Sequence, residues 1–241
     1  MYKETFEVSG FGGMKLPTIL WLPDGEPRRI LQITHGMTEH IGRYEAFAKK
    51  LTAQGIAVAG YDLRGHGKNP GNPNVASFGE GGWEAALEDM HLFFERLSTR
   101  FPGVPNDMLG FSLGSFLLRE YLGRWTEGVS RAIIMGTGYQ PAPVLSIMMA
   151  IVEGQIKKGG FDHTTNLVRK LSFGTYNKKF KPNRTQSTGS ARMRRRWMPI
   201  SPICFAAGIF RPVCFGSCWA RRSALAARRR AAHGIRTCRF C

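Results

Sequence analysis

The sequence predicts an α/β fold, with a mostly parallel sheet flanked by helices. Short apolar and β-branched runs alternate with longer segments in which apolar residues recur at helical spacing. Between one such strand and one such helix stands Gly-Phe-Ser-Leu-Gly at 110–114, a pattern typical of a sharp turn that lifts a serine above the sheet. The chain has 241 residues, enough for one sizeable domain of this class with a full core.

The expected elements alternate in the order that such a sheet requires. Residues 2–8 and 17–23 form an opening hairpin. Further strands are expected at 29–34, 56–60, 105–109 and 131–135, and helices at 44–54, 83–100 and 113–122. Gly55 directly follows the first helix, where glycine commonly acts as the cap. Strands separated by helices pair in parallel, so helices should cover both faces of the sheet.

Four residues fall where predicted strands end, namely His35, Asp62, Ser112 and Gly136. The carboxyl ends of parallel strands meet at one edge of a sheet, and ligands bind beyond that edge. The sequence therefore predicts one site around Ser112.

A serine in such a turn acts as a nucleophile when a histidine base and a carboxylate accompany it. In this kind of fold the chain order is serine, acid, histidine. The acids after Ser112 are Glu120, Glu127, Glu153 and Asp162, and none of them follows a plausible late strand. Beyond residue 186 there is only His233, with no acid before it in that segment. We therefore predict that this chain holds neither the catalytic acid nor the catalytic histidine.

Three segments together resemble one family. They are His-Gly-Met-Thr-Glu-His at 35–40 followed by Arg43 and Tyr44, Tyr-Asp-Leu-Arg-Gly-His-Gly at 61–67, and the turn at 110–114. In this order and spacing they resemble the α/β-hydrolase family, specifically monoacylglycerol lipases and lysophospholipase-like serine hydrolases. The resemblance covers roughly the first 185 residues. Phe111 departs from the histidine that is common there.

The resemblance implies a role for each matching residue. Ser112 would be the nucleophile, Gly110 and Gly114 the glycines of the turn, and the backbone N–H groups of Met37 and Leu113 the oxyanion hole. The implied activity is hydrolysis of carboxylic esters of small lipids, monoacylglycerol or lysophospholipid, through an acyl-enzyme. Neither a cofactor nor a metal is implied. A serine aminopeptidase-like hydrolase of the same fold is the alternative, because a fold does not determine the substrate.

Residues 140–186 are interpreted as a lid inserted over the site, after a core at 1–139. The segment 141–156 is apolar and rich in methionine, and a second helix is expected at 163–172. By the resemblance, the apolar side chains Val144, Leu145, Met148 and Met149 would help to hold an acyl chain. An ordinary core helix is the other interpretation of this segment.

Other polar residues near the site receive structural interpretations. We expect His35, Asp62 and His66 to brace their turns, Glu39 and His40 to form a solvated pair, and His91 to be structural.

Residues 187–241 differ in composition from the rest of the chain. They hold 12 arginines, all five cysteines and no Lys, Asp or Glu, whereas residues 1–186 carry 22 basic and 17 acidic residues, a net charge of +5. Reading codons from the third base onward permits Asp-Trp-Leu-Ser-Gln-Asp-Glu-Ala-Glu-Val-Asp-Ala-Tyr across 187–200, similar to an acidic stretch that the family carries after its lid. We hypothesise a frameshift near 185–187, which leaves 187–241 aberrant and the C-terminal part of the fold missing or disordered. Such a chain should be unstable and nearly inactive.

Two other interpretations treat residues 187–241 as genuine. Arg194–Arg196 and Arg228–Arg230 would then bind nucleic acid or an anionic membrane. Alternatively, Cys214, Cys218, Cys238 and Cys241 would hold zinc, with His233 nearby. Both rank below the frameshift, so the expected partner is a small lipid ester with transient contact to a membrane surface, and no nucleic acid. No signal peptide or spanning segment is evident, so a cytoplasmic location is expected, and the oligomeric state stays open.

Overall fold

The structure is a computed structural model that describes residues 1–37, 39–69, 78–139 and 141–159. Its centre is a six-stranded sheet in the order β1-β2-β4-β3-β5-β6. The strands are β1 Tyr2–Ser9, β2 Lys15–Leu22, β3 Arg29–Thr34, β4 Ile56–Tyr61, β5 Asn106–Phe111 and β6 Val129–Met135. Each predicted strand is confirmed, with ends that differ by one or two residues. The boundaries differ because the turn residues between strands decide them.

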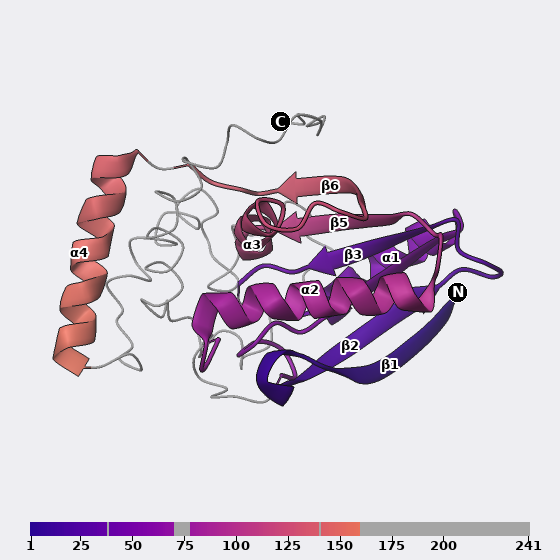
Figure 1. Cartoon of the computed structure of the whole chain (residues 1–241), viewed down its shortest axis with the longest axis horizontal. Helices are drawn as coiled ribbons and strands as arrows, with labels where there is room; N and C mark the ends of the chain where they lie inside the picture. The colour runs from indigo at the N-terminus through magenta and orange to yellow at the C-terminus, as the bar shows by residue number, and fades with distance from the viewer. Residues whose placement is uncertain (38, 70–77, 140, 160–241) are drawn as a thin grey trace, which may run out of the picture.

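The pairing directions match a mostly parallel sheet. β1 and β2 form an antiparallel hairpin, in which Tyr2 is opposite Leu22, and β2 pairs antiparallel with β4. β4, β3, β5 and β6 are parallel to one another. The carboxyl ends of these four strands therefore lie at one edge, as the sequence predicts (Figure 1).

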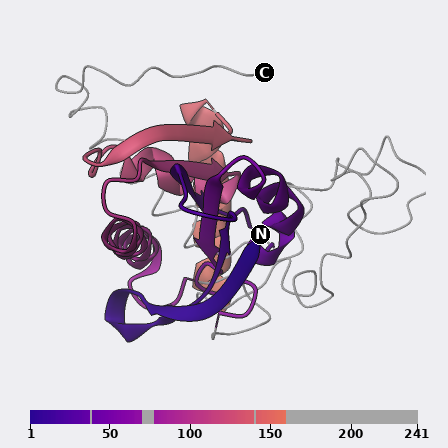
Figure 2. The ribbon, with the colours of Figure 1, turned by 90° about the vertical axis from the view of Figure 1, so that its right-hand side faces the viewer.

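Helices cover both faces of the sheet. α2 Gly82–Arg100 and α3 Leu113–Tyr121 lie on one face, and α1 Glu45–Thr52 lies on the other (Figure 2). Short 3-10 turns occur at η1 Phe11–Gly13 and η2 Ile41–Tyr44. α1 is shorter than the helix predicted at 44–54, because Tyr44 belongs to η2 and the chain turns after Thr52. Gly55 follows its end with φ of +74°, and its N–H donates to the carbonyl oxygen of Thr52 at 3.0 Å.

Two apolar clusters fill the space between these layers. The larger one joins the sheet to α2 and α3 and contains Leu20, Tyr61, Trp83, Phe93 and Leu117, all of them buried. The smaller one lies beneath α1 and includes Trp21, Ile33 and Val58. Alternate residues of β3 and β4 supply the two clusters, because successive side chains of a strand point to opposite faces.

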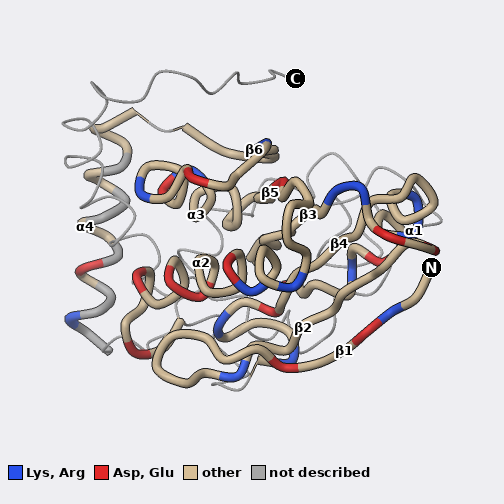
Figure 3. The backbone as a smooth tube through the Cα atoms, turned by 45° about the vertical axis from the view of Figure 1, so that its right-hand side comes forward, with Lys and Arg blue, Asp and Glu red and all other residues tan. Residues whose placement is uncertain are grey.

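Ion pairs of arginine and aspartate occur at two places, the first half-buried and the second buried. Arg29 donates to both carboxylate oxygens of Asp107, at 2.8 and 2.6 Å, where β3 and β5 begin. Arg64, in the turn after β4, pairs in the same manner with Asp89 on α2. Lys, Arg, Asp and Glu are distributed along most of the other described elements, and the first half of α4 carries none (Figure 3).

α4 Ala142–Gly159 lies beyond the carboxyl ends of β5 and β6 (Figure 1). This position agrees with the predicted helix at 141–156, but the division into core 1–139, lid 140–186 and tail 187–241 stays a prediction. Residues 160–241, including the second helix expected at 163–172, lie outside the described part. None of the described helices combines the length and the apolar character that crossing a bilayer requires.

Within the described residues β6 pairs only with β5, and its side chains are open to solvent. Ile133 is 45% exposed, Ile134 36% and Met135 44%. In a parallel sheet such a continuous apolar run usually belongs to a strand buried on both faces. The loss of later strands stays a prediction, because residues 160–241 lie outside the described part.

We predict that Leu87→Ala on α2 lowers the free energy of unfolding by about 2–5 kcal/mol, since Leu87 is fully buried and its loss leaves a cavity. Leu92→Ala on the same helix is the matched control, because Leu92 is 37% exposed, and it should change stability by roughly 0.5 kcal/mol. Urea unfolding followed by tryptophan fluorescence measures both. Equal losses in the two variants would contradict this assignment of the core.

Candidate functional site

The nucleophile candidate, Ser112, lies at the junction of β5 and α3. Its backbone has φ of 49° and ψ of −111°, and it is the one non-glycine residue with positive φ in the described part of the chain. The N–H of Ser112 donates to the carbonyl oxygen of Met135 at 2.9 Å, which ties the turn to β6. A strained conformation of this kind persists only where its surroundings enforce it, and it is typical of functional sites.

Gly110 and Gly114 permit the close packing of this turn. A Cβ atom on Gly110 would collide with the backbone of Gly114, and one on Gly114 would collide with the carbonyl oxygen of Thr34. The N-terminus of α3 therefore packs directly on the end of β3. Only glycine allows so close an approach of two backbones.

The loop after β3 lies beside the serine. An ideal Cβ on Gly36 would be 3.2 Å from Cβ of Ser112 and 3.1 Å from the ring of Phe111. Met37 follows in this loop, and Leu113 is the first residue of α3. Within the described residues neither the N–H of Met37 nor that of Leu113 has a hydrogen-bond acceptor. Their role as an oxyanion hole stays a prediction.

His35 braces this loop, as predicted. Its ring is fully buried, its Nε2 accepts a hydrogen bond from the N–H of Leu63 at 2.9 Å, and its Nδ1 lies 2.7 Å from the carbonyl oxygen of Gly36. Since Nε2 is an acceptor, the proton of the neutral ring resides on Nδ1 and is donated to Gly36.

The expected solvated pair of Glu39 and His40 is wrong. Glu39 is only 3% exposed, and its carboxylate accepts from the N–H of Gly36 at 2.5 Å and from the Tyr44 hydroxyl at 2.8 Å, and it also pairs with Arg43. The acid is buried because it satisfies three donors around the loop, which the sequence pattern does not reveal. Sequence reasoning missed that Glu39 supports the loop beside Ser112, and the four-residue spacing to Arg43 is the signal that could have revealed their pairing.

Asp62 and His66 brace the turn after β4, which confirms their predicted role. Asp62 accepts from the N–H groups of Ile41 at 2.8 Å and Lys68 at 2.7 Å. The Nδ1 of His66 lies 2.8 Å from the carbonyl oxygen of Arg64, and its ring meets that of His35 edge-on at 5.6 Å. Burial lowers the pKa of both His35 and His66 from 6.5 to about 4, so both rings are neutral near pH 7.

His91 also has the structural role that was expected. It stacks on Trp125 with ring centroids 4.5 Å apart, and its Nδ1 lies 3.2 Å from the hydroxyl of Tyr121.

Among the acids considered for the triad, Glu120 is buried on α3, where it accepts from the indole N–H of Trp83 at 2.7 Å and pairs with Arg124. Glu153 lies exposed on α4. Asp162 and His233 fall outside the described residues. The absence of a catalytic acid and histidine from this chain thus stays a prediction.

The expected acyl-chain residues lie on α4. Val144 is 41% exposed and the neighbouring Ile147 64%, whereas the side chains of Leu145, Met148 and Met149 are not described. Their role remains a prediction.

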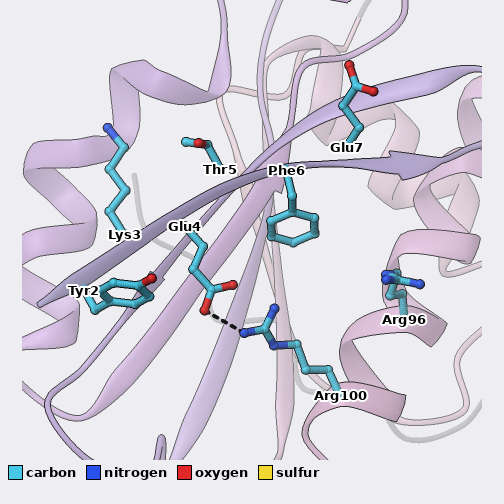
Figure 4. Close-up of a pocket in the computed structure, with 8 residues that line it drawn as sticks. All are labelled: Tyr2, Lys3, Glu4, Thr5, Phe6, Glu7, Arg96 and Arg100. Atoms are coloured by element: carbon cyan, nitrogen blue, oxygen red, sulfur yellow. Dashed lines mark hydrogen bonds and ion pairs between the residues drawn. The ribbon is translucent and has the colours of Figure 1, made fainter.

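A pocket of about 650 Å³ lies between β1 and the end of α2 (Figure 4). Its lining residues are Tyr2, Lys3, Glu4, Thr5, Phe6, Glu7, Arg96 and Arg100. Glu4 and Arg100 form an ion pair at 2.8 Å, and the lining contains no serine, cysteine or histidine. This pocket therefore offers no nucleophile–base pair, and the site beside Ser112 remains the candidate.

The strand order, with a strained serine at the carboxyl edge of the sheet between β5 and α3, defines an α/β-hydrolase fold. Residues 25–180 match the family described as serine aminopeptidase, S33 (Hydrolase_4). The chain belongs to this family.

Curated relatives share part of the sequence. The chain is 30% identical over 162 residues to a monoacylglycerol lipase of Mycolicibacterium smegmatis, a match that covers 63% of this chain and 54% of that protein. It is 32% identical over 94 residues to the monoglyceride lipase of Homo sapiens, covering 39% and 30%. The match thus spans about half the length of the mycobacterial relative and less than a third of the human one.

Solved structures share the fold. A thermostable carboxyl esterase from Bacillus coagulans, in complex with glycerol, superimposes with a TM-score of 0.66 at 23% identity, covering 86% of this chain and 72% of that chain. A monoglyceride lipase from Saccharomyces cerevisiae, in complex with a substrate analogue, gives 0.54 at 18% identity and covers 73% and 61%. At these identities the likeness establishes the fold alone.

We predict that Gly114→Ala destabilises the protein by roughly 3 kcal/mol, because the added methyl group overlaps the Thr34 carbonyl oxygen and neither backbone can yield. Gly138→Ala is the matched control, since its Cβ would meet only the ring of Phe116 at 3.7 Å. Thermal or urea unfolding compares the two variants. A Gly114→Ala protein as stable as the control would contradict this packing.

We also predict that stability falls as pH drops from 6.5 towards 4. The folded-state pKa of His35 and of His66 is about 4, below the ordinary 6.5, so the unfolded chain binds more protons in this window. The contribution of the two neutral histidines to the free energy of unfolding is complete above pH 6.5 and is lost on acidification. For one such histidine the loss is about 3 kcal/mol.

Urea unfolding at several pH values measures this slope. His66→Asn is the control, because asparagine keeps a donor near the Arg64 carbonyl group but does not titrate. The slope should fall by about half in this variant, and an unchanged slope would refute the assignment.

Proposed function

We propose that the chain derives from a serine hydrolase that cleaves carboxylic esters of small lipids, monoacylglycerol or lysophospholipid, through an acyl-enzyme. The observation that carries this proposal is the strained turn at Ser112, beside a loop and a helix N-terminus whose N–H groups are available. The names of the curated relatives, monoacylglycerol and monoglyceride lipases, support the substrate class.

In this proposal the Ser112 hydroxyl attacks the ester carbonyl carbon, and the carbonyl oxygen becomes an oxyanion. The N–H groups of Met37 and Leu113 would donate to that oxyanion, at roughly 3 kcal/mol of transition-state stabilisation each. Collapse of the intermediate expels the alcohol and leaves the acyl group on Ser112, from which water releases the fatty acid. Both transfers need a general base and acid, which the fold normally obtains from a histidine oriented by a carboxylate.

The apolar character of α4 favours a lipid substrate. The helix lies beyond the carboxyl ends of β5 and β6, at the edge of the sheet where Ser112 follows β5. It exposes Val144 and Ile147. Apolar side chains near a nucleophile suit an acyl chain, so we propose α4 as part of a lid.

The chain as written should retain little of this activity. Residues 187–241 would come from a shifted frame, so the catalytic acid and histidine that the parent gene encodes would be absent. Resequencing the DNA from codon 180 past the stop tests this directly. One missing or extra base that opens a frame with an acid followed by a histidine supports the proposal, and a confirmed frame refutes it.

A serine aminopeptidase of the same fold is the second candidate, and the family description favours it. Fluorogenic aminoacyl amides compared with monoacylglycerol distinguish the two, because peptide bonds and lipid esters present different leaving groups to the same nucleophile.

We predict that the chain hydrolyses monoacylglycerol about 10⁴- to 10⁶-fold more slowly than an intact family enzyme, since removing triad members costs rates of this order. Ser112→Ala should abolish whatever turnover and fluorophosphonate labelling remain. Ser98→Ala is the control, because Ser98 lies on α2 and its hydroxyl donates to the Phe94 carbonyl group. Turnover that survives Ser112→Ala undiminished would overturn the assignment of the nucleophile.

A further inference from the structure

A buried ion pair joins the turn after β4 to α2. Arg64 is 3% exposed and Asp89 1%. The guanidinium group donates from Nε to one carboxylate oxygen at 2.5 Å and from its Nη2 to the other at 2.9 Å. A buried pair of this kind is weak evidence for stability, because desolvation of the two charges offsets their attraction. Its geometry is therefore of greater interest than its energy.

The pair joins three segments that are distant in the sequence. Asp89 belongs to α2 and Arg64 to the turn after β4. The carboxylate also accepts the N–H of Phe11 at 2.7 Å, and the guanidinium group donates to the Phe11 carbonyl oxygen. A Cβ atom on Gly10 would collide with the Asp89 carboxylate, so η1 is packed directly against the pair.

The backbone next to Arg64 connects this pair to the loop beside Ser112. Leu63 precedes Arg64, and its N–H donates to Nε2 of His35. That bond leaves the proton of the neutral ring on Nδ1, where it meets the carbonyl oxygen of Gly36 at 2.7 Å. In a trans peptide the C=O and the next N–H point in opposite directions. The imidazole therefore holds the peptide between Gly36 and Met37 with the Met37 N–H directed away from the ring.

We propose that Arg64 and Asp89 are positioning residues for the loop beside Ser112. Their ion pair fixes the turn that carries Leu63, the Leu63 N–H selects the Nδ1-protonated tautomer of His35, and His35 orients the peptide that presents the Met37 N–H. The importance of that N–H for catalysis rests on the proposed function, but the relay from Asp89 to Gly36 does not.

The chain offers a matched control for this relay. Arg29 and Asp107 form a second two-bond pair, at 2.8 and 2.6 Å, where β3 and β5 begin. Because β3 ends at Thr34, this pair lies at the opposite edge of the sheet from the site. Asp89→Asn and Asp107→Asn thus remove the same charge from two-bond arginine–aspartate pairs at the two ends of the strands, of which the Arg64 pair is buried and the Arg29 pair half-buried.

The experiment measures ¹⁵N NMR spectra of [¹⁵N]histidine-labelled protein, together with amide hydrogen exchange, and needs no substrate. In the unmodified chain we expect a single Nδ1–H tautomer for His35. In Asp89→Asn we expect both tautomers and at least tenfold faster exchange of the Leu63 amide, whose N–H is bonded to His35, whereas in Asp107→Asn these signals should not change.

Gly10→Ala is the second variant, because it displaces the Asp89 carboxylate while both charges remain, and it should give the same result if Asp89→Asn fails to fold. A His35 that keeps one tautomer in Asp89→Asn and Gly10→Ala overturns the relay, and so does equal acceleration of exchange in Asp89→Asn and Asp107→Asn. Failure of the proposed function would show separately, as turnover independent of Ser112, and would leave the tautomer result unaffected.

Discussion

The contact between the N-terminus of α3 and the carboxyl end of β3 is the constraint on which the rest of the site depends. Gly114 packs against the carbonyl oxygen of Thr34 so closely that no side chain fits between them. This approach places α3 directly after β5 and forces Ser112 into its unusual backbone conformation. It also brings Gly36 within contact of the serine, so that the loop after β3 and the start of α3 flank one small volume.

That volume is surrounded by buried polar groups that support the loop from both sides. Glu39 accepts the N–H of Gly36, and His35 donates to its carbonyl group. The two peptide planes around one glycine are thereby held, and a glycine without such partners would be free to rotate. Preorganised donors stabilise developing charge better than donors that must reorient during the reaction. The loop is therefore held in one conformation beside Ser112, and its use as an oxyanion site stays a proposal.

Beyond β6 the described fold is open. The apolar run of this strand includes Ile133 and Ile134. Such a run is typical of an interior strand, but here both side chains are exposed. Burial of such side chains normally contributes much of the stability of an α/β domain. Residues 160–241 lie outside the described part of the chain, so the frameshift proposed for residues 187–241 stays a prediction.

The sequence alone determined the class of fold and the position of the nucleophile candidate, because strand and helix periodicity and the spacing of Gly110, Ser112 and Gly114 are local properties. It also identified His35, Asp62 and His66 as bracing residues at strand ends. Only the tertiary structure placed Glu39 inside the protein and paired Arg64 with Asp89. These contacts join segments far apart in the chain, and a carboxylate on a solvated turn has the same local sequence as a buried one. Packing, which the local pattern does not encode, decided between the two.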